Sequence, residues 1–273
     1  MTILVTGATG NIGRKVVDHL LARGVTDVRA LTVDPERAAL PNGVEVVNGS
    51  VRRPSSLDAA LDGAHAMYLA PYPATITDVL ARARDAGVGH VVDLSGEAES
   101  WWGSVNDAVE ASGARWTHLW PGDFMENVRM WLPQIRATGE VREPWPDARS
   151  TPTAMDDIAE VAAVALAEDG HDGRAYPLTG PAAVSRTEMA DAIATATGVP
   201  IRFVTGAPEE TVRALEPSMG ETATWFVENV LPALAGAEPK PNTLVADVTG
   251  RQATTFADWA AAHAGDLRAA ITG

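Results

Sequence analysis

The sequence predicts an α/β fold that is built on a parallel sheet. The chain begins with a short apolar run, Thr2–Val5, which indicates a buried strand and is followed at once by glycines and a helical pattern. Through the rest of the first half, strand-like runs alternate with helical segments, as they do in consecutive βαβ units. With 273 residues, the chain is long enough for one large α/β domain or for a core domain with a smaller lobe.

The glycine turn after the first strand has the spacing of a dinucleotide-binding fingerprint. Gly7 permits the tight turn, Gly10 lets the backbone approach a pyrophosphate, and Gly13 lets the helix pack closely on the strand. The helix that follows points its amide N–H groups and the positive end of its dipole toward the phosphates. The other residues expected to bind the cofactor at this turn are Thr9, Asn11, Ile12 and Arg14. The alternative is a glycine-rich turn without a ligand, which the flanking strand and helix argue against.

Each further element is predicted from a local apolar pattern and from its start and stop residues. The strands expected after the first one lie at residues 27–33, 44–47, 66–70, 90–95, 116–120, 175–179 and 201–204. The helices expected after the one behind the glycine turn begin at 34 or span 55–61, 76–86, 105–111, 153–167, 185–197, 209–215, 221–234 and 255–264. Ser185 is expected to cap its helix through a capping box, and Asp34 is expected to cap the helix that begins there.

The composition excludes several classes of function. The chain has no Cys, which excludes disulfides, thiolate zinc sites and a cysteine nucleophile. Its formal net charge of -15 opposes binding to nucleic acid or to an anionic membrane. The six His show no metal-ligand spacing, and no apolar run is long enough to cross a bilayer. We therefore expect a cytoplasmic monomer or homodimer without a metal, a nucleic-acid partner or a membrane partner.

With these elements in place, the chain resembles the NmrA-like branch of the atypical short-chain dehydrogenase/reductases. The stretches that carry the resemblance, in chain order, are Gly7–Gly13, Asp34-Pro35, His90–Ser95, 112–127 and 156–181. The resemblance implies a Rossmann domain with a doubly wound parallel sheet at residues 1–122, completed by a returning strand near 174–180. It also implies a smaller, mainly helical substrate lobe at residues 123–273, with the substrate in the cleft between the two.

The family's enzymes use NADPH or NADH to reduce quinones, activated double bonds, imines or carbonyls, so the resemblance implies NADP(H) or NAD(H) as the cofactor. The form of the cofactor stays open. Val33 stands where NADPH-dependent relatives usually have an Arg, which removes the clearest NADP signal. Asp34 has the spacing of a carboxylate that holds a ribose 2′-OH, although its Asp-Pro context also suits a helix cap. Arg14 or Arg37 could meet a 2′-phosphate, or each could be a solvated helix-face arginine.

The standard proton-relay pair of short-chain dehydrogenases is missing. In that pair, Tyr-x-x-x-Lys, the Lys lowers the pKa of the Tyr so that it can deliver a proton. The lysines are Lys15 and Lys240, and neither follows a Tyr at four residues. Hydride transfer is still possible, because a quinone, an iminium or an enone needs little help from an acid.

The candidate active-site residues follow the carboxyl ends of the predicted strands, where ligands bind in open α/β sheets. Pro71, Ser95 and Pro121 are expected to flank the nicotinamide. Tyr72 is the first candidate for the proton donor and Asp123 the alternative. The competing interpretations are a loop aromatic for Tyr72, a strand-end residue for Ser95 and local hydrogen bonding around a turn for Asp123.

Tryptophan is concentrated in one part of the chain, since six of the 8 Trp lie between Trp101 and Trp145. An aromatic wall for a flat, hydrophobic substrate is predicted from Trp102, Trp120, Phe124 and Trp131. Ordinary packing between the lobes is the competing interpretation.

These observations predict an NAD(P)H-dependent reductase of an aromatic, quinone-like, enone or imine small molecule. Two alternatives remain. One is a dinucleotide-binding, redox-sensing regulator without turnover, which the missing Tyr/Lys pair and the missing Arg at Val33 favour. The other is a non-redox cyclase or isomerase that keeps the fold.

Overall fold

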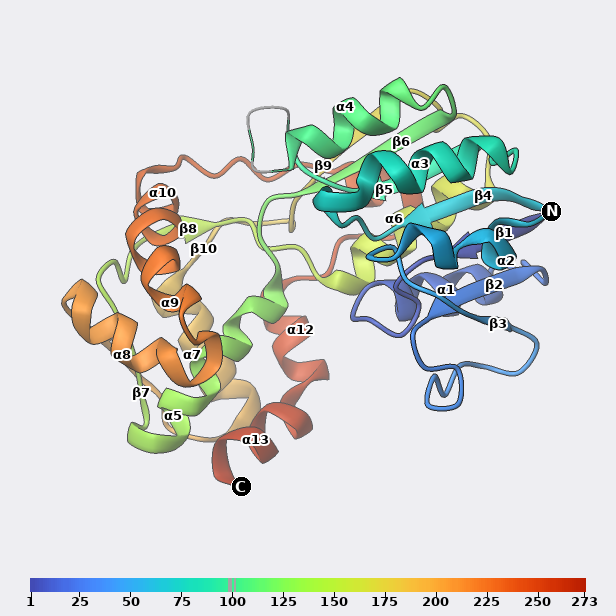
Figure 1. Cartoon of the computed structure of the whole chain (residues 1–273). Coiled ribbons are helices and arrows are strands. Elements are labelled where there is room, and N and C mark those ends of the chain that lie inside the picture. Colours follow the sequence, from blue (N-terminus) through green and yellow to red (C-terminus); the bar gives the residue numbers. More distant parts are fainter. Residues whose placement is uncertain (98–99, 101) are drawn as a thin grey trace. The chain divides into compact units, whose positions relative to one another are not determined.

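The computed structural model describes residues 1–97, 100 and 102–273, and the chain forms two compact units (Figure 1). The first unit comprises Met1–Gly122, Met155–Leu178 and Leu244–Arg251, and the second comprises Asp123–Ala154, Thr179–Thr243 and Gln252–Gly273. Residues 155–173 and 244–251 therefore lie in the first unit, although the sequence analysis assigned them to the C-terminal lobe. No helix in the described part of the chain is long and apolar enough to cross a membrane.

The first unit is organised around a seven-stranded sheet in the order β3-β2-β1-β4-β5-β6-β9. Every neighbouring pair of strands is parallel. The strands are β1 (Thr2–Val5), β2 (Val28–Thr32), β3 (Glu45–Asn48), β4 (Ala64–Leu69), β5 (His90–Leu94), β6 (Arg115–Pro121) and β9 (Arg174–Leu178). Strand order reverses between β1 and β4, which confirms the prediction of a doubly wound α/β fold.

Helices cover both faces of this sheet. The helices of the first unit are α1 (Gly13–Ala22), α2 (Asp58–Leu61), α3 (Ile76–Asp85), α4 (Gly103–Ala111), α6 (Met155–Ala167) and α11 (Leu244–Thr249). Short 3₁₀ turns lie at Pro54–Ser56 and Pro73–Thr75. Apolar residues of α2, α3 and α4 share one buried cluster with β1, β4 and β5, whereas α1 packs against α6. The sheet is thus buried on both sides, as its nearly continuous apolar strands require.

Helix α6 belongs to the first unit because it is apolar around most of its circumference. Nine of its residues are buried, and it contacts β4, β5 and β6 as well as α1. The segment after α11 is tied to it by Arg251, whose guanidinium lies 2.6 Å from the carboxylates of Asp157 and of Glu160. The local sequence indicates an apolar helix at these positions, but it does not indicate which sheet the helix packs on.

The second unit is mainly helical and contains two small two-stranded sheets (Figure 1). Its strands are β7 (Glu140–Glu143), parallel to β11 (Arg202–Thr205), and β8 (Arg149–Ser150), antiparallel to β10 (Val184–Ser185). Its helices are α5 (Leu132–Thr138), α7 (Arg186–Thr197), α8 (Pro208–Met219), α9 (Thr222–Trp225), α10 (Leu231–Gly236), α12 (Phe256–Ala262) and α13 (Ala264–Thr272). A 3₁₀ segment spans Met125–Trp131 and a π-helical turn spans Phe226–Val230. The capping box at Ser185 is present.

The predicted local structure differs from the observed structure in several places. The helix expected to begin at Asp34 is only a turn, in which the Asp34 carboxylate accepts the backbone N–H of Arg37 at 3.3 Å. The chain cannot continue as a helix because Ala39 has a φ of 47°. Strand β7 was not predicted, because three of its four residues are charged and the segment becomes a strand only when β11 pairs with it. Helices α5, α11 and α13 and the short strands β8 and β10 were also missed.

A buried ion pair organises the core of the second unit. The Arg186 guanidinium donates to both carboxylate oxygens of Glu143, through Nε at 2.8 Å and Nη2 at 2.7 Å. The Trp131 indole N–H donates to the same carboxylate at 2.7 Å, and the guanidinium carbon lies 4.5 Å from the centroid of the Trp131 ring. Removing one partner would leave the other charge buried without compensation, which is costly.

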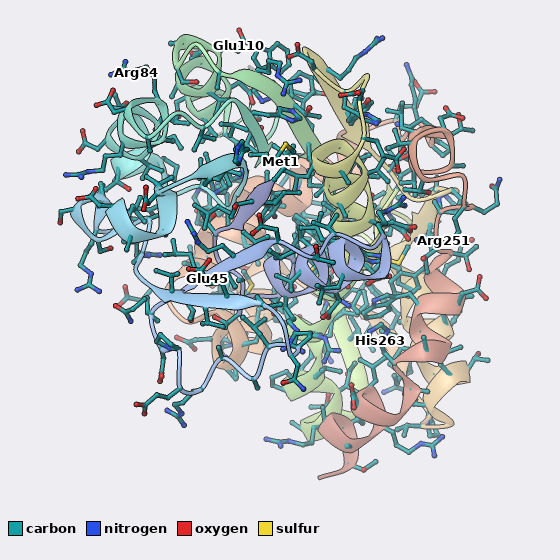
Figure 2. All side chains as sticks on the ribbon, turned by 90° about the vertical axis from the view of Figure 1, so that its right-hand side faces the viewer. Met1, Glu45, Arg84, Glu110, Arg251 and His263 are labelled. Atoms are coloured by element: carbon teal, nitrogen blue, oxygen red, sulfur yellow. The ribbon has the colours of Figure 1, made fainter. Side chains whose placement is uncertain are left out.

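We expect Glu143→Gln to lower the free energy of unfolding of the second unit by about 3–5 kcal/mol, because Arg186 would remain buried without its counter-charge. The control is Asp85→Asn, which removes the partner of Arg84 on the surface of the first unit (Figure 2) and should change stability by less than about 0.5 kcal/mol. Hydrogen exchange followed by mass spectrometry measures the protection of backbone amides in each unit separately. Equal protection in the Glu143→Gln variant and the wild type would contradict this account.

Candidate functional site

The ends of β1 and β4 are joined at the point where strand order reverses. The Thr6 backbone N–H and side-chain Oγ1 both donate to the carbonyl oxygen of Tyr68 at 3.0 Å. The same hydroxyl accepts the backbone N–H of Ala70 at 2.8 Å. Thr6 is buried, so these bonds are shielded from water. They fasten the end of β1 to the end of β4 at the position where α/β sheets of this kind bind their ligands.

The glycine turn fits tightly between β1 and α1. Gly7 has a φ of +61°, which favours glycine, and its carbonyl accepts the Gly10 N–H at 2.8 Å. A Cβ on Gly13 would lie 2.2 Å from the Gly7 carbonyl oxygen, which is far inside contact distance. Only glycine at position 13 therefore lets α1 begin directly against the turn.

The beginning of α1 suits an anion. Gly7, Gly10 and Asn11 are exposed, whereas Ile12 and Gly13 are buried beneath them. Within the described chain, no side chain caps this end of α1 and no acidic residue stands in its first turn. The backbone N–H groups and the helix dipole are thus available to a phosphate.

Two residues near the glycine turn contact the end of β2 and the loop that follows it. Thr9 Oγ1 lies 3.2 Å from Thr32 Oγ1, which ties the glycine turn to the end of β2. Arg14 donates from Nη1 to the carbonyl of Ala39 at 2.8 Å. Asp34 lies in the same loop as Ala39. It follows Val33, which is 65% exposed. The loop after β2 thus carries the carboxylate that could hold a ribose hydroxyl, and α1 carries the cation that could meet a 2′-phosphate.

Asn106, on α4, connects the ends of β5 and β6. Its Oδ1 accepts the Ser95 hydroxyl at 2.7 Å and the Trp120 indole N–H at 3.3 Å. Its Nδ2 donates to the carbonyl of Gly96 at 2.6 Å. The Ser95 hydroxyl donates a hydrogen bond to Asn106, so the lone pairs of its oxygen remain to accept a hydrogen bond from a ligand. The sequence showed Asn106 only as one polar residue within a helix, so its role was missed.

Tyr72 stands at the carboxyl end of β4, directly after Pro71, and both residues are half-buried. The Arg52 guanidinium carbon lies 4.1 Å from the centroid of the Tyr72 ring, a distance at which a cation is attracted to the ring face. Within the described chain, no residue forms a hydrogen bond with the Tyr72 hydroxyl. This hydroxyl therefore remains a candidate proton donor.

Asp123, the alternative donor, is engaged in local hydrogen bonds. Its Oδ1 accepts the Phe124 backbone N–H and the Asn127 side-chain amide, each at 2.8 Å, and its Oδ2 accepts the Ser150 hydroxyl at 2.8 Å. These three donors engage both carboxylate oxygens within the turn. The arrangement favours the competing interpretation, in which Asp123 shapes the turn.

The structure separates the members of the predicted aromatic wall. Trp131 has no exposed surface and donates its N–H to Glu143, so its assignment as a substrate contact is wrong. Trp102 is 38% exposed at the start of α4, and Trp120 is half-buried on β6. Phe124 is half-buried in the second unit. Trp101 lies outside the described residues.

Other polar residues of the sheet are sealed within it. His118 Nδ1 lies 2.6 Å from Asp93 Oδ2, and its ring stacks on that of Trp116 at a centroid distance of 4.2 Å. Burial, with a smaller contribution from Asp93, raises the pKa of the Tyr68 hydroxyl, so this group stays protonated. No three His, Asp or Glu of the described residues lie close enough together to hold a metal ion.

The chain is similar to known NAD(P)H-binding proteins and reductases. Residues 7–99 match a family model described as NAD(P)H-binding. The chain is 37% identical to a (4-alkanoyl-5-oxo-2,5-dihydrofuran-3-yl)methyl phosphate reductase of Streptomyces griseus, over 96% of this chain and 98% of the relative. It is 36% identical to an NAD(P)H azoreductase of Xenophilus azovorans, over 98% of this chain and 100% of the relative.

A solved structure has the same fold. The triphenylmethane reductase of Citrobacter sp., complexed with NADP(H), superposes with a TM-score of 0.84 at 22% identity, over 97% of this chain and 100% of that one. The same family is indicated by the glycine turn, by the matched NAD(P)H-binding region and by the two full-length relatives. The chain belongs to the NmrA-like family of atypical short-chain dehydrogenase/reductases, and its first unit is an NAD(P)H-binding domain.

Proposed function

We propose that this protein is an NAD(P)H-dependent reductase of an aromatic, quinone-like, enone or imine small molecule. The observation that carries the proposal is the glycine turn, where a Cβ at position 13 would strike the Gly7 carbonyl and no side chain in the described chain caps α1. The names of the two relatives, a reductase of a (4-alkanoyl-5-oxo-2,5-dihydrofuran-3-yl)methyl phosphate and an azoreductase, support reduction. The cytoplasmic location and the monomeric or homodimeric state belong to the same proposal.

The residues of the first unit divide the work of binding. Gly7, Gly10 and the amides at the start of α1 hold the pyrophosphate. Asp34 from the loop after β2 and Arg14 from α1 face the adenosine ribose, so either form of the cofactor finds a partner. Pro71, Ser95 and Pro121 flank the nicotinamide, with Asn106 holding the Ser95 hydroxyl in place. A bound reduced nicotinamide supplies the hydride.

Tyr72 supplies the proton where the substrate needs one. After donation, the negative charge on its oxygen is stabilised by the Arg52 guanidinium, which lies over the ring. Arg52 thus replaces, in part, the Lys of the missing Tyr-x-x-x-Lys pair. A substrate that accepts a hydride readily depends on this step least.

A redox-sensing regulator without turnover is the second candidate. It is favoured by the missing Tyr/Lys pair and by the engagement of Asp123 in three local hydrogen bonds. Oxidation of NADPH or NADH in the presence of a panel of quinones and enones tests the choice. Consumption of the cofactor supports the reductase. Binding of the cofactor without its consumption would instead support the regulator. Conversion of a substrate without consumption of the cofactor would support a cyclase or isomerase.

We expect Gly13→Ala to weaken NADPH binding by at least about tenfold, because the added methyl group forces the turn and α1 apart. Isothermal titration calorimetry measures the affinity. Gly265→Ala is the matched control, because a Cβ at that position in α13 meets open space. Wild-type affinity in the Gly13→Ala variant would show that the nucleotide does not lie on this turn.

We expect Tyr72→Phe to lower kcat for an enone by about 10²-fold, because the variant keeps the ring beneath Arg52 and removes the acidic hydroxyl. The decrease should be much smaller for a quinone, which is more easily reduced, and NADPH affinity should stay unchanged. Steady-state kinetics with both acceptors gives the comparison. An unchanged kcat for the enone would exclude Tyr72 as the proton donor.

A further inference from the structure

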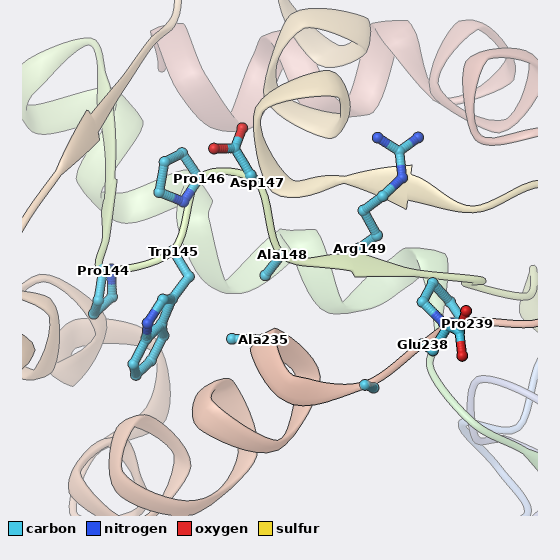
Figure 3. Close-up of a pocket in the computed structure, with 10 residues that line it drawn as sticks. Pro144, Trp145, Pro146, Asp147, Ala148, Arg149, Ala235, Glu238 and Pro239 are labelled. Atoms are coloured by element: carbon cyan, nitrogen blue, oxygen red, sulfur yellow. The ribbon is translucent and has the colours of Figure 1, made fainter.

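Two further features of the described chain lie outside the groups used above. One is a slot of about 430 Å³ in the second unit, between the segment 144–149 and the end of α10 (Figure 3). It is lined by prolines, alanines, Trp145 and charged residues. The other feature is the pair of Asn-Gly dipeptides of the sequence, Asn42-Gly43 and Asn48-Gly49, both in the first unit. Unlike the slot, these dipeptides can change their own covalent structure.

An Asn-Gly dipeptide deamidates without an enzyme or a cofactor. The backbone nitrogen of the glycine attacks Cγ of the asparagine, so that a C–N bond forms, ammonia leaves and a cyclic imide results. Water then adds to either carbonyl of the imide, which opens to aspartate or to isoaspartate. One water is taken up for each ammonia released, and nothing is oxidised or reduced. Glycine favours the attack because it has no Cβ beside the nitrogen.

At Asn42-Gly43 both reacting groups are free. The two residues are exposed and lie in a turn between β2 and β3. Among the described residues, no group forms a hydrogen bond with the Asn42 side chain or with the Gly43 backbone N–H. The turn is closed by a long hydrogen bond from the Val44 N–H to the Pro41 carbonyl, at 3.4 Å, which uses neither reacting group. A Cβ on Gly43 would meet open space, so the glycine has room to move.

At Asn48-Gly49 the same two groups are held by the end of β2. Asn48 Nδ2 donates to the carbonyl of Val33 at 2.9 Å, and the Gly49 N–H donates to the carbonyl of Thr32 at 2.9 Å. Gly49 is buried, and a Cβ there would lie 2.7 Å from the carbonyl oxygen of Ser56. The attacking nitrogen and the side-chain amide can therefore approach each other only after this part of the sheet opens.

We propose that Asn42 is a site of spontaneous deamidation in the folded protein, whereas Asn48 is protected by its contacts with the end of β2. The product adds one negative charge to the loop whose Ala39 carbonyl accepts Arg14. As isoaspartate, it also adds one atom to the backbone of that loop. The inference is independent of the proposed reductase chemistry.

The test is the rate at which each asparagine is deamidated in the full, folded chain. The protein is incubated at mildly alkaline pH in heavy-oxygen water and then digested with trypsin in ordinary water, so that heavy oxygen marks only the reaction before digestion. Residues 38–52 form one tryptic peptide, because they lie between the cleavage sites after Arg37 and Arg52. Tandem mass spectrometry of this peptide assigns the new carboxylate to position 42 or 48.

We expect Asn42 to react at least about tenfold faster than Asn48, because two hydrogen bonds have to open before Asn48 can react. The synthetic peptide 38–52 is the matched control, since it has both dipeptides without the fold, and its two asparagines should react at comparable rates.

Asn42→Gln is the control variant, because its longer side chain would have to close a larger ring. The position is exposed, so the variant should fold normally. On anion exchange, it should lack the more acidic species that accumulates in the wild type.

Equal rates at Asn42 and Asn48 in the folded protein, or a faster reaction at Asn48, would overturn the proposal. An unreacted Asn42 in the folded protein, under conditions that deamidate the synthetic peptide, would overturn it as well. The same amount of acidic species in Asn42→Gln would assign the change in charge to another residue and would also contradict the proposal.

Discussion

The contact between the glycine turn and the start of α1 is the constraint on which the rest of the first unit depends. The Gly7 carbonyl occupies the space that any side chain at position 13 would need. Helix α1 can therefore begin directly against the turn that follows β1, with its N-terminus at the glycine turn. Thr6 adds the second constraint, because its three hydrogen bonds hold the end of β1 to the end of β4. Together they place a phosphate-binding surface where strand order reverses.

The polar groups near the strand ends divide into those that build the structure and those that remain for a ligand. Asp123 and Glu143 are fully used in local or buried hydrogen bonds. The Ser95 hydroxyl donates its hydrogen bond to Asn106, so its oxygen can still accept one from a ligand, and the Tyr72 hydroxyl has no hydrogen-bond partner among the described residues. This division explains how the fold can support hydride transfer without a Tyr-x-x-x-Lys pair. Most of the chemistry comes from the nucleotide, and the protein has to hold it in place.

The sequence predicted the parallel sheet and the glycine turn because both depend on local signals, namely short apolar runs and glycines at fixed spacing. The roles of Trp131 and Asn106 could not be predicted in this way. Trp131 is buried by its contact with Arg186, which is 55 positions away, and Asn106 acts through residues of two different strands. The proposed cofactor contacts of Arg14, Asp34, Pro71, Ser95 and Pro121 stay predictions, as does the role of Tyr72.

The central claim is that a nicotinamide dinucleotide lies with its pyrophosphate on the start of α1. A crystal structure of the protein grown with NADPH tests it most directly. The account predicts phosphate oxygens within hydrogen-bonding distance of the backbone N–H groups of Asn11 or Ile12, with the nicotinamide toward Ser95. Electron density for the nucleotide elsewhere, with the glycine turn empty at saturating NADPH, would contradict the account.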